Sequence, residues 1–379
     1  MPESRSPGSR TRVVIVALLA ALSLIETLAC LITIPTEQLW PVKMVAREIT
    51  PWFLAVNLVG VLIAWRWKIS QAIFVVGVAV ALWPVARDQG VAAGLQQQWR
   101  EQGFDATILN VDGPVALLEG AFRHVVLPDI EPEMLSPTIA LYRPAVASTR
   151  LLPIVVDIHG GSWQHGGVRE DDAFARLVAP LGYAVFTIDY RKAPQFTYPA
   201  QRDDVGGTIR WVHDNAARLG ADATRIALVG RSAGGHLALL AAFQGVGIPI
   251  RSVISFYGPA DMLALYNDPP VPDPLDVRDK ARAFLGGSPS QVPDAYREAS
   301  PITHVRSDLP PTLLIQGASD NIVQARFTRD FHSRLRAAGA TSLLLEIPWA
   351  DHSFDFVYFG VSNQLAGSVV ESFLTATLR

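Results

Sequence analysis

One short segment constrains the fold of this chain more than any other part of the sequence. Residues 230–234 read Gly-Arg-Ser-Ala-Gly and lie between a strand-like run (225–229) and a helix-like run (235–243). A serine on such a sharp strand-to-helix turn needs glycine two residues before and after it, because a Cβ at either position would collide with neighbouring backbone. The turn exposes the hydroxyl and aims backbone amides and the positive helix end at developing negative charge. The segment therefore predicts that Ser232 is a nucleophile.

A second glycine motif directly follows the apolar run 152–158. Residues 159–163 read His-Gly-Gly-Ser-Trp. Glycines at this place let the backbone approach a substrate closely, and amide N–H groups here would complete an oxyanion hole begun by the amide of Ala233. His159 could be a catalytic base, but its place inside a loop motif favours a structural hydrogen bond. Trp163 has two open roles, as a wall of the acyl pocket or as a support of the loop.

The chain from about residue 89 onward alternates short β-branched runs with helical stretches. This pattern is typical of a mostly parallel sheet covered by helices. Residues 262–301 form a long excursion between two of the expected strands, where they could act as a lid or a pocket wall. The expected strands are residues 138–142, 152–158, 184–189, 225–229, 252–256, 312–316 and 343–347.

From residue 138 onward the chain resembles the hormone-sensitive-lipase-like and kynurenine-formamidase-like branches of the α/β-hydrolase superfamily. The resemblance rests on the two glycine motifs, on Asp189-Tyr190-Arg191, on residues 313–320 and on Asp351-His352 followed by Ser353-Phe354. It implies the α/β-hydrolase fold and an acyl-transferring serine. In lipase-like members the loop is usually His-Gly-Gly-Gly and the donors are the amides of its second and third glycines. By position these are Gly161 and Ser162, but a serine there fits the His-Gly-Gly-X-Trp form of the formamidase-like branch, so the class of acyl donor stays open.

Chain order gives an independent argument for the other catalytic residues, because α/β-hydrolases place nucleophile, acid and base in that order. Asp320 follows an expected strand and His352 follows the last one, which predicts a triad of Ser232, Asp320 and His352. A neutral imidazole takes the serine proton, and the carboxylate fixes the tautomer and stabilises the imidazolium. Asp351 and Asp355 are rivals for the acid, but they lie too close to His352 in sequence to face its ring easily.

The other polar residues near these motifs are expected to be structural. His304 and His332 have arginines nearby, which indicates solvated surface, and His236 inside the helix after Ser232 is expected to be a satisfied, partly buried histidine. Asp189-Tyr190-Arg191 ends a strand and is expected to form an ion pair or to pin a loop. The predicted site comprises Ser232, Asp320 and His352 for catalysis, Gly161, Ser162 and Ala233 for the oxyanion, His159, Gly160, Gly230 and Gly234 as supports, and Trp163 at the pocket.

The apolar pattern of the first ninety residues predicts a membrane anchor. After a basic start, the apolar run 13–34 is long enough to cross roughly 30 Å of hydrocarbon as a helix. Glu26 within it is expected to face other helices or to be protonated. The alternative is a cleaved secretory signal, since basic residues precede the apolar run and Leu28-Ala29-Cys30 resembles a processing site. Further apolar segments after Cys30 weigh against it.

Those segments, 52–66 and 69–85, predict two more spans, with tryptophans at their ends suited to the membrane interface. The alternative is one span plus buried helices of a soluble core. The predicted domains are thus an anchor, 1–90, and a catalytic α/β-hydrolase domain, 91–379. Positively charged residues favour a cytoplasmic amino terminus and an extracytoplasmic catalytic domain. They are Arg5, Arg10, Arg12, Arg66 and Lys68 on the inner side, against Lys43, Arg47 and Arg87 on the outer side.

The leading functional hypothesis is a membrane-anchored serine esterase that cleaves carboxylic esters without a metal or organic cofactor. The anchor suggests lipid or cell-envelope esters as substrates, and small soluble esters stay open because tethering alone need not orient the pocket toward lipid. A net charge of −3 gives no basic field for nucleic acid, and the single cysteine, Cys30, excludes a cysteine-based zinc cluster and an intrachain disulfide. An acyltransferase or formamidase using the same triad remains open, because the choice depends on which nucleophile enters the pocket. A non-enzymatic membrane interaction module is disfavoured because all three triad residues are present.

Overall fold

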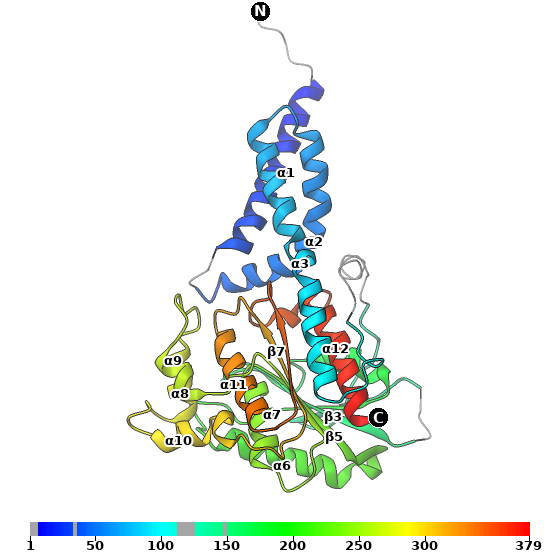
Figure 1. Cartoon of the computed structure of the whole chain (residues 1–379), viewed down its shortest axis with the longest axis vertical. Helices are drawn as coiled ribbons and strands as arrows, with labels where there is room; N and C mark the ends of the chain where they lie inside the picture. Colours follow the sequence, from blue (N-terminus) through cyan, green and yellow to red (C-terminus); the bar gives the residue numbers. More distant parts are fainter. Residues whose placement is uncertain (1–6, 33–35, 112–125, 147–149) are drawn as a thin grey trace, which may run out of the picture.

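The computed structural model describes residues 7–32, 36–111, 126–146 and 150–379. A bundle of three helices stands on a larger domain in which helices cover a β-sheet (Figure 1). The larger domain carries every residue of the predicted active site.

The sheet has eight strands in the order β1-β2-β4-β3-β5-β6-β7-β8. The strands from β3 to β8 are parallel to one another, while β2 is antiparallel to both β1 and β4. The seven expected strands are confirmed, and the short, partly exposed edge strand β1 is an addition. The strands are β1 (Glu133–Ser136), β2 (Ile139–Tyr142), β3 (Leu152–Ile158), β4 (Ala184–Ile188), β5 (Ala221–Arg231), β6 (Ser252–Phe256), β7 (Thr312–Gly317) and β8 (Ser342–Ile347).

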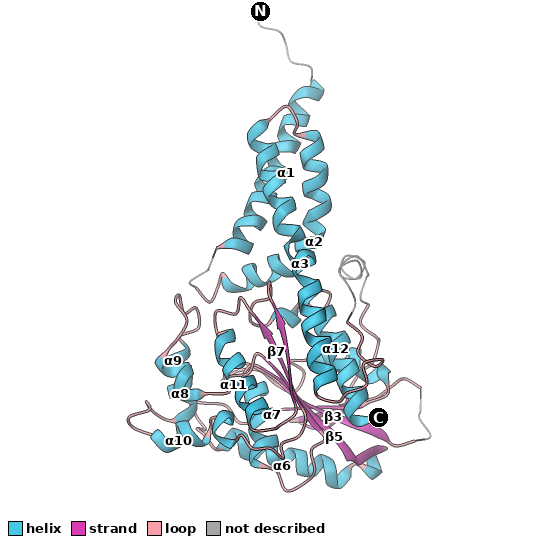
Figure 2. Ribbon diagram, in the orientation of Figure 1, coloured by secondary structure: helices cyan, strands magenta, loops and turns pink. Residues whose placement is uncertain are grey.

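Helices cover both faces of the sheet (Figure 2). One apolar cluster joins one face to Val205, Leu237 and Phe331 of α6, α7 and α11, and a second joins the other face to α5 and α12. The central strands are buried on both faces, which explains their continuous apolar runs. The helices are α5 (Asp172–Val178), α6 (Ala200–Asn215), α7 (Ala233–Gln244), α11 (Ala325–Ala337) and α12 (Val361–Leu378), with single 3₁₀ turns at η1 (Ala179–Leu181), η2 (Ala217–Leu219) and η4 (Phe354–Phe356).

The excursion between β6 and β7 is mainly helical. It holds α8 (Met262–Asn267), α9 (Val277–Leu285), α10 (Pro293–Glu298) and the 3₁₀ helix η3 (Pro301–His304). Phe284 of α9 stacks on Trp163 with ring centroids 4.4 Å apart. The excursion therefore packs against the loop that carries the second glycine motif.

The bundle consists of α1 (Pro7–Leu31), α2 (Trp40–Ile63) and the first part of α3 (Lys68–Glu101). By length and composition, Thr11–Leu31 and Trp40–Ile63 could each cross a membrane, and Lys68–Pro84 is a shorter apolar stretch. The helix that holds most of the predicted second span, 52–66, begins earlier, at Trp40, and ends at Ile63. The end of the predicted first span, 33–34, lies outside the described residues.

The predicted domain boundary between residues 90 and 91 falls inside α3. The helix passes through Pro84 without ending, and its second part packs against the sheet domain, where Leu95 and Trp99 are buried. The Gln98 side chain donates to the carbonyl of Leu344 and accepts from the amide of the same residue in β8. The bundle and the sheet domain consequently share one continuous helix.

Trp99 tests whether α3 is part of the catalytic domain's core. Its ring is fully buried against Phe104 and Phe373, and its indole N–H donates to the carbonyl of Asp105. We expect Trp99→Ala to lower the free energy of unfolding by about 3–5 kcal/mol. Denaturant unfolding in detergent measures this, with Trp65→Ala, an exposed tryptophan at the far end of the bundle, as the control. Equal small effects of the two variants would contradict the assignment.

Candidate active site

Ser232 occupies the junction between β5 and α7 with a strained backbone, φ 52° and ψ −119°. The glycines around it are required by close backbone packing. A Cβ on Gly230 would lie 2.3 Å from the carbonyl oxygen of Gly234, and one on Gly234 would lie 1.9 Å from that of Ile158. The strand-to-helix turn expected from the sequence is thus present, and it holds the serine at the carboxyl edge of the parallel strands.

The structure brings Ser232, His352 and Asp320 together in one hydrogen-bonded chain. Nε2 of His352 lies 3.0 Å from Oγ of Ser232, and Nδ1 lies 2.8 Å from Oδ2 of Asp320. The carboxylate also accepts hydrogen bonds from the amides of Ile322 and Val323 and from the side chain of Gln316. Asp320 is therefore held as an acceptor, which favours the tautomer with the proton on Nδ1 and a free Nε2 facing the serine.

The two rival carboxylates have other partners. Asp351 accepts from the backbone amide of His352 and pairs with Lys43, 2.6 Å away. Asp355 pairs with Arg231 at 2.5 Å. Both are engaged by cations, so Asp320 is the carboxylate whose oxygen reaches the imidazole.

The His-Gly-Gly-Ser-Trp loop lies directly on the serine turn. A Cβ on Gly160 would lie 3.0 Å from the carbonyl oxygen of Arg231. Gly161, Ser162 and Trp163 all have positive φ, which turns the chain back on itself. Within the described part of the chain, no group accepts a hydrogen bond from the amides of Gly161, Ser162 or Ala233. These amides are available to a ligand beside Ser232, which is half exposed.

His159 supports this loop and does not reach the serine. Its Nδ1 lies 2.6 Å from the carbonyl oxygen of Gly160, and its Nε2 lies 3.0 Å from Asp189. Its ring stacks on Tyr190, whose hydroxyl donates to the His159 carbonyl. Arg191, at the end of the same strand, pairs with Asp204. The structural roles expected for His159 and for Asp189-Tyr190-Arg191 match these contacts.

Trp163 also supports the loop, because its side chain is buried and its indole N–H donates to Nδ1 of His236. Nε2 of His236 lies 2.6 Å from the carbonyl oxygen of Ala299 in the excursion. Burial lowers the pKa of His236 to about 4, so this imidazole is neutral near pH 7. Of the two roles open for Trp163, the contacts favour the support.

His304 and His332 both lie away from the triad. His304 contacts Gln244, and Nδ1 of His332 lies 2.8 Å from the hydroxyl of Ser342. The solvated position expected for His332 is wrong, because the ring is partly buried and desolvation lowers its pKa to about 4. The described residues contain no cluster of three or more side chains arranged to hold a metal ion.

Sequence reasoning missed a buried ionic cluster beneath the serine turn. The guanidinium of Arg231 lies 2.7 Å from Asp157 at the end of β3, 3.4 Å from Asp171 and 2.5 Å from Asp355. The hydroxyl of Tyr257 donates to Asp355. Burial raises the pKa of Asp157 and of Asp171, and the charge of Arg231 acts in the opposite direction on both.

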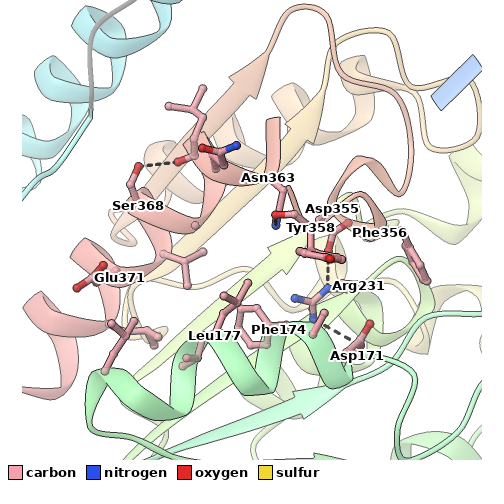
Figure 3. Close-up of a pocket in the computed structure, with 18 of the residues that line it drawn as sticks. Asp171, Phe174, Leu177, Arg231, Asp355, Phe356, Tyr358, Asn363, Ser368 and Glu371 are labelled. Carbon is pink, nitrogen blue, oxygen red and sulfur yellow. Dashed lines mark hydrogen bonds and ion pairs between the residues drawn. The ribbon is translucent and has the colours of Figure 1, made fainter. Parts of the chain in front are cut away.

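This cluster borders a cavity of about 560 Å³ (Figure 3), and the residues that line the cavity do not include Ser232, Asp320 or His352. In the view, Arg231 reaches toward Asp171 and Asp355, and Phe174 and Tyr358 lie beside it. One guanidinium joins the Ser232 turn to β3 and to the loop after β8 that carries His352 and Asp355, called the histidine loop below. The cluster therefore fixes the loops that carry Ser232 and His352. The only signal in the sequence was the charged residue at the second position of the serine motif.

Comparison with known proteins assigns the chain to a family. The protein-family model BD-FAE matches residues 139–335, more than half of the chain. The chain belongs to the BD-FAE family. Esterase LipQ of Mycobacterium tuberculosis is 31% identical to this BD-FAE member over 246 residues, which cover 61% of the chain and 57% of LipQ. The chain thus spans little more than half the length of LipQ.

Solved structures agree on the fold of the BD-FAE member. A bacterial heroin esterase matches with a TM-score of 0.58 and 25% identity over 70% of this chain and 90% of the esterase. An esterase from Pyrobaculum calidifontis matches with a TM-score of 0.58 and 24% identity over 76% and 94%. The sheet domain has the α/β-hydrolase fold, and the relatives support the hormone-sensitive-lipase-like side of the resemblance.

His236 predicts a pH dependence of stability. Below its ordinary pKa of 6.5 the unfolded chain gains a proton at this residue that the folded chain does not bind until about pH 4. The contribution of His236 therefore becomes less favourable as the pH falls from 6.5 to 4, by about 3 kcal/mol. The difference in unfolding free energy between wild type and His236→Gln, measured from pH 4 to 7, should shrink toward low pH. A constant difference across this pH range would contradict the prediction.

Proposed function

We propose that this BD-FAE member is a membrane-anchored serine esterase that cleaves carboxylic esters through an acyl-serine intermediate. The observation that carries the proposal is the continuous chain of contacts from Ser232 Oγ to His352 Nε2 at 3.0 Å and from His352 Nδ1 to Asp320 at 2.8 Å. The strained turn that presents Ser232 at the carboxyl edge of the sheet supports the same assignment.

In the first half of the reaction, His352 accepts the proton of Ser232 as Oγ attacks the ester carbonyl. The tetrahedral oxyanion receives hydrogen bonds from the amides of Gly161, Ser162 and Ala233, which have no other acceptor in the described chain. His352 then gives its proton to the leaving alkoxide, and the alcohol departs. Asp320 stabilises the imidazolium through the bond to Nδ1.

In the second half, His352 takes a proton from water, and the resulting hydroxide attacks the acyl-serine carbonyl. Collapse of the second oxyanion returns the proton to Ser232 and releases the carboxylic acid. An acceptor alcohol or amine in place of water would make the enzyme a transferase. Hydrolysis is proposed because relatives such as LipQ and the heroin esterase are named esterases.

The proposed membrane location rests on a helical bundle that has polar side chains inside and apolar side chains outside. Its buried positions include polar side chains, and the hydroxyl of Ser23 donates to Asn57 across two helices at 2.5 Å. Glu26, which was expected to face other helices, is buried among them. The outer surface is apolar, as lipid requires and water does not favour. Large apolar side chains exposed there include Leu18, Ile25, Leu28, Leu58, Leu62 and Val75.

The bundle stands at the end of the catalytic domain where the triad lies. Trp40 of α2 faces His352, with ring centroids 6.2 Å apart. An ester that partitions into the bilayer would therefore reach the serine over a short path, and we propose a lipid or envelope ester as the substrate.

Charge at the two ends of the bundle supports an extracytoplasmic catalytic domain. Arg12, Arg66 and Lys68 lie at the far end, where a guanidinium nitrogen of Arg12 donates to the carbonyl of Ile63. At the near end, Lys43 and Arg47 both lie within ion-pair distance of Asp351, which reduces their net charge. Arg87 is the one of the three near-end cations without an ion pair in the described part of the chain, against Arg12, Arg66 and Lys68 at the far end. The far end thus keeps the larger positive charge, and the positive-inside tendency favours the cytoplasm for it.

Ser232→Ala is expected to lower kcat/KM for p-nitrophenyl esters by about 10³-fold or more, because the nucleophile is lost. The measurement uses the full-length protein in detergent and esters of increasing acyl length. Ser333→Ala, an exposed serine on α11, should stay within about twofold of wild type. Turnover retained by Ser232→Ala would refute the proposed mechanism.

The topology is tested with a reporter that is active only in the cytoplasm. Fused after Arg379 it should give no signal, and fused before Met1 it should be active, because the two ends lie on opposite sides of the membrane in the proposal. The reverse pattern would overturn the orientation. Signal from both fusions would place both ends in the cytoplasm.

A further inference from the structure

The first part of α2 is attached to the catalytic domain by a buried ion pair. Nζ of Lys43 lies 2.6 Å from Oδ2 of Asp351, and the two side chains are 3% and 0% exposed. Arg47, one helical turn further on, lies 3.6 Å from the same oxygen. In Figure 1 this part of α2 lies across the top of the sheet domain before the helix turns to run beside α1.

The other carboxylate oxygen of Asp351 holds backbone next to two members of the triad. Oδ1 accepts from the amide of His352 at 2.9 Å and lies 3.4 Å from the amide nitrogen of Asn321, the residue after Asp320. The carboxylate of Asp351 thus joins the histidine loop to the loop after β7 that carries Asp320. Its charge is balanced by Lys43, which lies more than 300 residues away in the sequence.

Further contacts fix α2 to both flanks of the histidine loop. Glu48 accepts from the amide and the hydroxyl of Ser362, at 2.9 and 2.6 Å, and the hydroxyl of Ser362 also accepts from the indole N–H of Trp349. Trp40 lies against the ring of His352. The loop that carries the catalytic histidine is therefore packed against an element outside the hydrolase fold proper.

We propose that Lys43 is a positioning residue for His352 and acts through Asp351. The inference rests on the proposed function, because it assigns Lys43 to the same reaction. A buried carboxylate that loses the closer of its two cations must gain water or a proton, or draw the more distant Arg47 inward. Each of these changes moves Asp351, and with it the amides of His352 and Asn321 that Oδ1 holds. A displacement of about 1 Å at the imidazole is enough to cost roughly 10²-fold in rate.

The consequence is that the membrane anchor is part of the catalytic apparatus. The helix that supplies Lys43 contains Pro51 and continues into the bundle as far as Ile63. The catalytic base is thus oriented by a helix that, as a whole (Trp40–Ile63), is a candidate membrane span by length and composition.

A double-mutant cycle on Lys43 and Asp351 tests this proposal in the full-length protein. With p-nitrophenyl butanoate, Lys43→Met is expected to lower kcat by about 10- to 100-fold and to leave KM within about twofold. Asn at position 351 keeps an acceptor for the two amides without a buried charge. In the Asp351→Asn background, Lys43→Met is therefore expected to cause no further loss of kcat, and the double variant should exceed Lys43→Met alone.

Lys68→Met is the matched control, because Lys68 is exposed on the same anchor and forms no ion pair with the described residues. A Lys43→Met protein with wild-type kcat would overturn the proposal. So would a further tenfold loss when Lys43→Met is added to Asp351→Asn, and this comparison remains decisive if Lys43→Met alone does not fold. Turnover that survives Ser232→Ala would refute the proposed function, an outcome separate from either result.

Discussion

The close approach of Gly234 to the end of β3 is the constraint on which the rest of the site depends. A Cβ on Gly234 would lie 1.9 Å from the carbonyl oxygen of Ile158 and 2.4 Å from that of His159. With hydrogen in its place, the start of α7 lies directly against the loop after β3. This contact sets the loop of residues 159–163 against the turn that carries Ser232, and a Cβ on Gly160 would lie 3.4 Å from the Cβ of Ser232. Neighbouring parallel strands supply the two loops, so the proposed oxyanion site depends on sheet topology.

Buried ion pairs beneath and beside this turn hold the loops of Ser232 and His352 in position relative to each other. Arg231 is buried, and a buried guanidinium is tolerated only when it is paired and hydrogen-bonded. Its partners Asp157, Asp171 and Asp355 come from β3, the start of α5 and the histidine loop. On the other side of the histidine loop, Lys43 forms a similar buried ion pair with Asp351. His352, the proposed catalytic base, therefore lies in the sequence between Asp351 and Asp355, which pair with cations from different parts of the chain.

The local features of this arrangement could be predicted from the sequence, and the long-range ones could not. Ser232 was identifiable because its strand, turn and helix are contiguous, and the strands carry their own apolar pattern. Edge strand β1 was not predicted, because it is short and partly exposed and so has no clear apolar pattern. The start of α2 was not predicted, because Lys43, Arg47 and Glu48 make this part of the sequence look like a polar connection. In the structure each forms an ion pair or a hydrogen bond with a residue at position 351 or 362. Likewise, Pro84 and the polar residues after it concealed that α3 continues into the core, since a proline in a sequence normally marks a break.

These contacts join the helical bundle and the α/β-hydrolase domain into one structure around the proposed nucleophile, Ser232. The most direct test of that account is to label the full-length protein with a fluorophosphonate probe in native membranes and to locate the adduct by peptide mass spectrometry. The account predicts a single modified residue, Ser232, and loss of ester turnover in proportion to labelling. An adduct on another residue, or full turnover in protein labelled to completion at Ser232, would contradict it.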